Sequence, residues 1–117
     1  MGIFTGYVMI DWVRVIELRN EIGADGFAEV IELFLEEVES VIGTLGQAPA
    51  TLPEDLHFLK GSALNLGFRA FGDICRQTER RCTEGTATQA DIAATQACYI
   101  ASKAEFLTRM QEVGTAA

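Results

Sequence analysis

The segment from Thr51 to Gly67 decides the fold, and it reads TLPEDLHFLKGSALNLG. Its start carries two helix signals. Thr51 followed by Glu54 forms a capping box, and Pro53 falls in the first turn, where a missing N–H does no harm. Gly67 can take the left-handed conformation that ends many helices. The segment therefore predicts a helix that ends at Leu66.

One side of this helix is apolar, and the other carries the only histidine of the chain. At 100° per residue, the apolar side chains fall within a continuous stripe of roughly 80°. The stripe consists of Leu52, Leu56, Leu59, Ala63 and Leu66. His57 lies opposite this stripe, so we expect its imidazole to face water rather than the core.

Four residues surround His57 on the helix, all within about 60° of it. They are Lys60, Gly61, Leu64 and Phe68. Glycine inside a helix costs about 1 kcal/mol relative to alanine, so Gly61 indicates a need for space beside the ring, or else close helix packing. Lys60 can stabilise a phosphoryl oxygen, or it is an ordinary surface lysine. The apolar pair Leu64 and Phe68 predicts either a docking surface or a patch covered by the first helix.

The remaining chain divides into four more helical segments. The first runs from about Asp11, its N-cap, to residue 22, and Gly23 ends it. The second begins at its N-cap Asp25 and reaches about residue 45. Another spans about residues 70–82, and Thr88 with Asp91 opens the last, which reaches about residue 113. We expect one all-α domain over residues 1–117: an antiparallel up-down four-helix bundle with the short first helix packed across one end.

Helical spacing also predicts which residues of these segments face the core. In the second segment they are Phe27, Val30, Ile31, Phe34, Val38, Val41, Ile42 and Leu45. In the segment after Gly67 they are Phe71, Ile74, Cys75, Thr78 and Cys82. In the last segment they are Ala93, Ala97, Ile100, Ala104 and Leu107, a less regular set.

Charge and cysteine content exclude several kinds of function. The net charge of −8 disfavours nucleic acid and anionic membranes as partners, although residues 56–83 carry five basic and only two acidic side chains. The three cysteines, Cys75, Cys82 and Cys98, lack the spacing of a disulfide framework or a metal site. Because the sequence contains neither a secretory signal nor an apolar run of about 20 residues, we expect a cytoplasmic protein without a bound metal.

Residues 56–67 resemble the signature of histidine phosphotransfer (HPt) domains. That signature is a histidine followed by x-Leu-Lys-Gly-Ser/Ala-Ser/Ala, then a hydrophobic residue and a glycine about ten positions after the histidine. The sequence matches it from His57 to Gly67 and departs only at Leu56, where the family often has alanine. The resemblance implies an exposed histidine that accepts a phosphoryl group through Nε2. Lys60 would steady that group, Gly61 would leave room for it, and Glu79 would orient the ring.

The resemblance further implies a freestanding phosphorelay carrier. It would take the phosphoryl group from a receiver-domain aspartate of a hybrid histidine kinase and pass it to a response regulator. We expect a monomer with no kinase activity and no cofactor of its own, the Mg²⁺ being held by the receiver. The basic residues Arg69, Arg76 and Arg80 would steer the acidic receiver pocket toward the histidine.

Three other functions stay open at this stage. The chain could be a similar bundle that binds a receiver without transferring phosphate. It could also be the phosphoacceptor domain of a chemotaxis-type kinase, labelled by an ATP-bound kinase domain. A metal-binding bundle is the third alternative, and the scarcity of ligand residues disfavours it.

Overall fold

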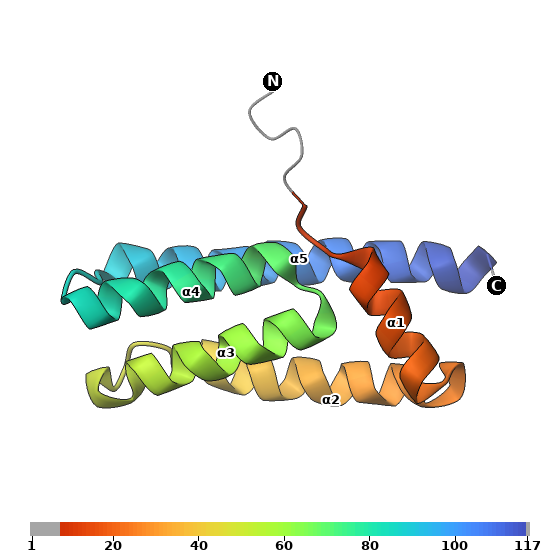
Figure 1. Ribbon diagram of the computed structural model, residues 1–117, viewed down its shortest axis with the longest axis horizontal. Helices are drawn as coiled ribbons and strands as arrows, with labels where there is room; N and C mark the ends of the chain where they lie inside the picture. Colours follow the sequence, from red (N-terminus) through yellow and green to blue (C-terminus); the bar gives the residue numbers. More distant parts are fainter. Residues whose placement is uncertain (1–7, 117) are drawn as a thin grey trace, which may run out of the picture.

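The computed structural model describes residues 8–116, with side chains as far as residue 111, and this part of the chain is helical without strands (Figure 1). Its α-helices are α1 (Trp12–Ile22), α2 (Ala24–Gly43), α3 (Leu52–Leu66), α4 (Arg69–Glu84) and α5 (Gln89–Ala116), and a 3-10 turn, η2 (Pro49–Thr51), precedes α3. The prediction of an all-helical fold is thus confirmed. Within residues 8–116, no helix combines the length and apolarity needed to cross a membrane.

The four longer helices lie along a common direction, and the chain reverses at each connection between them (Figure 1). Helix α1 runs across the others at the end where α2 begins and α5 finishes. The helices α2 and α5, with 20 and 28 residues, are longer than α3 and α4, with 15 and 16. The ends of α2 and α5 therefore extend beyond the shorter pair, and α1 packs there.

The residues at the start of α1 form hydrogen bonds with the C-terminal end of α3. The Asp11 side chain accepts a hydrogen bond from the Arg14 N–H and caps α1 as predicted, while the Asp11 N–H donates to the Gly67 carbonyl at 2.7 Å. The Arg14 guanidinium donates to the backbone and side-chain oxygens of Asn65. These contacts bring α1 directly against the C-terminal end of α3.

Gly67 ends α3 with a φ of 94°, the left-handed C-cap predicted from the sequence. A Cβ added there would lie 2.8 Å from the Asp11 carbonyl oxygen, closer than non-bonded atoms tolerate. Both the backbone angle and the neighbouring chain therefore require glycine at this position.

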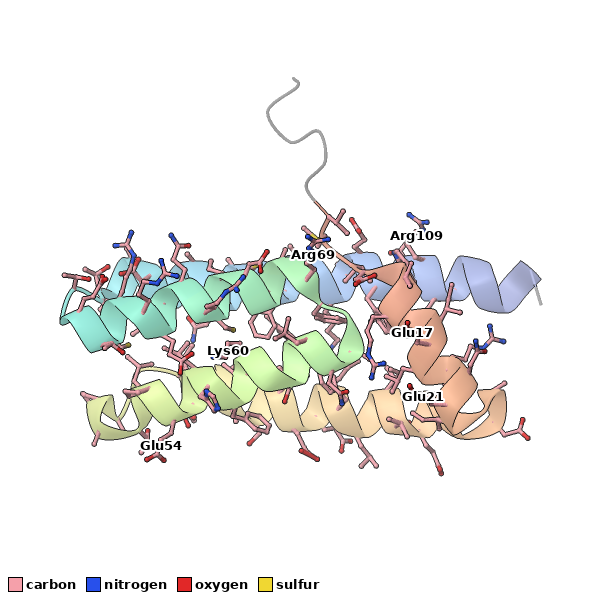
Figure 2. All side chains as sticks on the ribbon, in the orientation of Figure 1. Glu17, Glu21, Glu54, Lys60, Arg69 and Arg109 are labelled. Atoms are coloured by element: carbon pink, nitrogen blue, oxygen red, sulfur yellow. The ribbon has the colours of Figure 1, made fainter. Side chains whose placement is uncertain are left out.

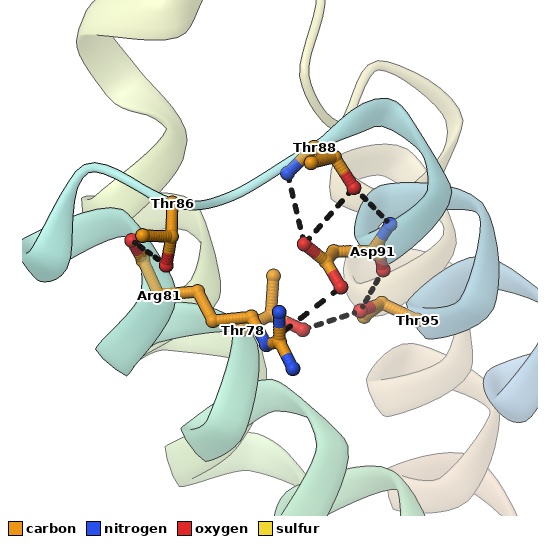
Figure 3. Close-up of polar contacts among 6 residues, drawn as sticks. All are labelled: Thr78, Arg81, Thr86, Thr88, Asp91 and Thr95. Atoms are coloured by element: carbon orange, nitrogen blue, oxygen red, sulfur yellow. Dashed lines mark hydrogen bonds and ion pairs between the residues drawn. The ribbon is translucent and has the colours of Figure 1, made fainter.

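Gly23, with a φ of 97°, ends α1 as predicted. It also precedes α2, so the prediction of Asp25 as the N-cap is wrong, and Asp25 lies inside the first turn. Thr51 is the N-cap residue of α3 as predicted, but the capping box is absent, because Thr51 has helical dihedral angles and its hydroxyl bonds to Ala48 and Asp55. The capping box of Thr88 and Asp91 is confirmed, with reciprocal bonds of 2.8 and 3.3 Å (Figure 3).

The predicted inward face of α5 is wrong. Its members are all exposed: Ala93, Ala97, Ile100, Ala104 and Leu107. The buried face consists of Ile92, Thr95, Tyr99, Ser102 and Phe106. Figure 3 shows why a hydroxyl can be buried here: Thr95 Oγ1 donates to the Asp91 carbonyl and lies 3.0 Å from Thr78 Oγ1 of α4. A satisfied hydroxyl removes the penalty of burial, and two aromatic rings bury more area than alanines do.

The other predicted core residues are largely correct. The α3 stripe is buried throughout, as are Phe71, Cys75 and Thr78 of α4. In α2, Val30 is 36% exposed although it was predicted to face the core, and the buried Leu35 was not predicted. Phe68, expected on the exposed side of α3, is fully buried, because Gly67 turns the chain and Phe68 becomes the residue before α4.

Candidate functional site

His57 projects from the middle of α3 into solvent, with 71% of its side chain exposed. The flanking residues Leu56 and Leu59 are fully buried, so the helix is fixed to the core on the opposite side. The prediction that the imidazole faces water, opposite the buried stripe of α3, is confirmed.

Glu79 of α4 contacts two side chains of α3. One carboxylate oxygen lies 3.2 Å from His57 Nδ1, and the other accepts a hydrogen bond of 2.9 Å from Lys60 Nζ. Figure 2 shows Lys60 on the side of α3 toward α4. Lys60 and Glu79 are each 24% exposed, so water only partly screens their ion pair. One carboxylate therefore fixes the relative positions of the imidazole and the ammonium group.

The charge of Glu79 determines which imidazole nitrogen is free. The hydrogen bond from Lys60, opposed by partial burial and assisted by His57, lowers the pKa of Glu79, so the carboxylate is ionised at neutral pH. An ionised carboxylate only accepts hydrogen bonds, so Nδ1 must carry the proton. Nε2 of the neutral ring then keeps its lone pair, which is the arrangement that a nucleophilic imidazole needs.

Gly61, one turn after His57, leaves open space on the surface. A Cβ added at Gly61 would meet no other heavy atom within 4 Å. The alternative that Gly61 permits close helix packing is therefore wrong. A group carried on the ring, or the backbone of a partner, can approach α3 here.

A hollow of about 760 Å³ lies between α2 and α3, and His57 is at its edge. Its lining residues are Val30, Leu33, Phe34, Glu37, His57, Phe58, Gly61, Ser62 and Asn65. Leu33 and Phe58 are 58% and 39% exposed. The contribution of α2 to this surface was not predicted from the sequence. A signal was present, because Val30, Leu33 and Phe34 share one edge of α2, beside the residues that enter the core.

Only one residue of the predicted docking pair, Leu64 and Phe68, is exposed. Leu64 is 56% exposed on α3, close to Gly72 of α4. Phe68 is fully buried, with its ring 5.2 Å from that of Phe106 and 6.1 Å from that of Phe34. Phe68 cannot contact a partner, and its inclusion in a docking surface was wrong.

The three predicted steering arginines are exposed on α4. Arg69, Arg76 and Arg80 are seven and four residues apart, which places them on one side of the helix, and Figure 2 shows Arg69 at the start of α4. Arg76 donates a 2.9 Å hydrogen bond to Asp73, so part of this positive charge is neutralised. Within residues 8–116, no three His, Cys, Asp or Glu side chains group as metal ligands would.

Comparison with known proteins gives a family and two relatives. The family described as "Hpt domain" matches residues 29–114. Two relatives, each described as "Phosphorelay protein LuxU", come from Vibrio vulnificus strains YJ016 and CMCP6. Each is 31% identical over 84 residues, which cover 68% of this chain and 73% of the relative. No solved structure gives a match. The family match spans α3, α4 and the side chains assembled around His57.

Proposed function

This chain belongs to the Hpt domain family, and we propose that it is a phosphorelay carrier that holds a phosphoryl group on His57 Nε2. The observation that carries the proposal is an exposed imidazole whose Nδ1 is held by Glu79. The phosphorelay role named for the two relatives supports it. In this proposal, α2 to α5 form an antiparallel four-helix bundle, and α1 packs across one end.

The proposed reaction needs no group beyond the two proteins and the receiver's metal ion. The Nε2 lone pair attacks the phosphorus of a receiver aspartyl phosphate, an N–P bond forms, and the P–O bond to the aspartate breaks. The electron pair of that bond leaves on the aspartate carboxylate. The positive charge that develops on the imidazole is shared with Nδ1–H, which Glu79 stabilises at 3.2 Å. Donation to the next receiver is the reverse of these steps.

Lys60 and Gly61 provide the remaining requirements of phosphoryl transfer, which depends mainly on positioning and charge stabilisation. Glu79 holds Lys60 Nζ at 2.9 Å, on the same part of α3 as the imidazole. The ammonium group would stabilise the equatorial phosphoryl oxygens. The open surface at Gly61 would admit the phosphoryl group and the active-site loops of the receiver.

Receiver domains are the proposed partners, one from a hybrid histidine kinase and one from a response regulator. We propose that each docks on the hollow between α2 and α3, where Leu33 and Phe58 supply exposed apolar area beside His57. The exposed arginines of α4 would attract the acidic pocket that surrounds the receiver aspartate and its Mg²⁺. This role would place the carrier in the cytoplasm with its receivers.

The experiment is phosphoryl transfer from a radiolabelled phospho-receiver to the purified chain. The unmodified chain should acquire label that is stable in base and labile in acid, whereas His57→Gln should acquire none and keep its helical circular dichroism. Lys60→Ala should slow transfer at least tenfold, because it removes a charge that acts in the transition state. An unchanged rate would remove Lys60 from its assigned role.

The same experiment separates the two other phosphorelay-related functions. Binding to the receiver without transfer of label would indicate an interaction module. Labelling by an ATP-bound kinase domain alone would indicate the phosphoacceptor domain of a chemotaxis-type kinase. Both outcomes would contradict the carrier role.

A further inference from the structure

The unequal helix lengths leave a second surface feature at the end of the molecule where α1 crosses. A hollow of about 330 Å³ lies between α1, the start of α2 and the end of α5. It is lined by Trp12, Val15, Ile16, Arg19, Phe27, Arg109 and Met110. A neighbouring hollow of about 380 Å³ between α2 and α5 shares Arg19, Phe27 and Met110 with it. Neither hollow includes any residue of the His57 site.

The chemistry of the first hollow is unusual for this acidic chain. Its walls are aromatic and aliphatic apart from two guanidinium groups, and none of its lining residues is acidic. Arg109 lies over the Trp12 ring at 5.6 Å from the centroid. The adjoining hollow has one carboxylate, Glu32, in its lining. Two guanidinium groups and no carboxylate therefore line the first hollow, although the net charge of the chain is −8.

Arg19 is the important member of this set. It is half-buried, it lines both hollows, and within the described part of the chain its guanidinium has no hydrogen-bond or ion-pair partner. The other arginine of α1, Arg14, is by contrast fully engaged with Asn65, Glu17 and Glu21. An unpaired guanidinium at the edge of an apolar hollow is complementary to an anionic group attached to an apolar chain.

We propose that this hollow binds a small anionic amphiphile, such as a medium-chain carboxylate, with its tail along Trp12, Phe27 and Met110 and its anionic head on Arg19. The volume falls within the range of small-molecule sites, about 300–1,000 Å³. The lining follows the usual composition of such sites, mostly apolar with a few polar groups that set orientation. The proposal is independent of the phosphorelay function, because no residue of the His57 site takes part.

Trp12 is the only tryptophan of the chain, so its fluorescence reports directly on the hollow. The intact protein is titrated with monomeric decanoate, and isothermal calorimetry gives an independent affinity. We expect saturable one-site binding that changes the Trp12 emission. Octanoate should bind roughly fifteenfold more weakly than decanoate, because it lacks two methylenes and each buried methylene contributes about a fourfold factor.

The charge preference is tested with Arg19→Gln and with ligands of other charge. Arg19→Gln should weaken decanoate binding at least fivefold and leave decanol binding within twofold, since decanol lacks the anionic head. Decyltrimethylammonium should bind more weakly than either. Arg80→Gln is the matched control, because it removes an exposed guanidinium from α4, outside both hollows, and it should leave decanoate binding unchanged.

Three outcomes would overturn the proposal. One is the absence of saturable decanoate binding by both fluorescence and calorimetry. A second is equal weakening by Arg19→Gln and Arg80→Gln, which would indicate an effect of net charge alone. The third is co-sedimentation with vesicles containing anionic lipid in the absence of binding to monomeric decanoate, which would indicate a membrane-surface contact instead of a site.

Discussion

At the scale of single residues, Glu79 connects the imidazole of His57 to the ammonium group of Lys60, and this has a consequence for stability. The folded-state pKa of Glu79 is lowered, chiefly by Lys60. The ion pair therefore stabilises the fold above the ordinary carboxyl pKa of 4.5 and is lost as the pH falls through the folded-state value. We predict that Glu79→Gln lowers the free energy of unfolding by about 0.5–1 kcal/mol at pH 7. This difference should shrink steadily below about pH 4.5.

Urea denaturation of both proteins between pH 7 and pH 3 measures this difference. Glu84→Gln is the control, because Glu84 is an exposed carboxylate in the last turn of the same helix. The free energy of unfolding of Glu84→Gln should differ from that of the unmodified chain by less than about 0.5 kcal/mol at every pH. A difference for Glu79→Gln that does not depend on pH would contradict the ionic origin of the effect.

The sequence predicted some of these residue contacts and could not predict others. The exposure of His57 followed from its angle to the apolar stripe of α3, and the open space at Gly61 followed from the cost of glycine inside a helix. The hydrogen bond of Glu79 to Lys60 joins residues 19 apart in different helices. Local periodicity contains no information on such a contact, and only the family resemblance indicated a role for Glu79.

At the scale of helices, the junction between α3 and α4 depends on Gly67. Alanine there must adopt a φ near 94° and place its Cβ about 2.8 Å from the Asp11 carbonyl oxygen. We predict that Gly67→Ala lowers the free energy of unfolding by about 2–4 kcal/mol, from the left-handed backbone and the displacement of α1. Chemical denaturation followed by circular dichroism measures the loss.

Gly85 provides the matched control for this prediction. It also ends a helix in the left-handed region, with a φ of 75°, but an added Cβ would meet no atom within 4 Å. Gly85→Ala should therefore lower the free energy of unfolding by only about 1–2 kcal/mol, the backbone contribution alone. Equal losses for the two variants would show that the contact between Gly67 and Asp11 contributes nothing.

The helices also show where reading a sequence by periodicity fails. The predicted and the observed buried faces of α5 differ by a rotation of about 100° around the helix axis. The predicted face contains the apolar residues Ile100 and Leu107. The face that is buried contains Tyr99 and Phe106 together with the hydroxyl residues Thr95 and Ser102. The buried face includes a contact across helices, because Thr78 of α4 is itself buried and its hydroxyl lies 3.0 Å from that of Thr95. That pairing is a tertiary contact, which the sequence of α5 alone does not contain.

At the scale of the whole molecule, large apolar side chains are exposed on several helices, and two of them allow a matched comparison. Leu33 of α2 is 58% exposed at the hollow beside His57, and Ile100 of α5 is 65% exposed and lies outside that hollow. We predict that Leu33→Ala weakens receiver binding at least fivefold, because it removes apolar area from the proposed docking surface. Calorimetric titration with a receiver domain measures the affinity.

Ile100→Ala is the control for docking. It deletes a similar exposed area on a helix that does not border His57, so receiver affinity should stay within twofold. The free energy of unfolding of both variants should lie within about 0.5 kcal/mol of that of the unmodified chain, because substitutions at exposed positions usually have small effects. If Ile100→Ala weakens binding as much as Leu33→Ala, the receiver docks elsewhere. Only the assembled fold distinguishes these surfaces, because the α2 side of the hollow depends on how α2 and α3 pack.

The contact of Glu79 with His57 and Lys60 means that folding itself brings together the groups that the proposed transfer would use. The proposed carrier would therefore present its imidazole to an arriving receiver in the orientation that Glu79 already holds. It would use this one arrangement for both donor and acceptor. The direction of phosphoryl flow would then follow mass action, set by the relative amounts of phosphorylated receivers on either side.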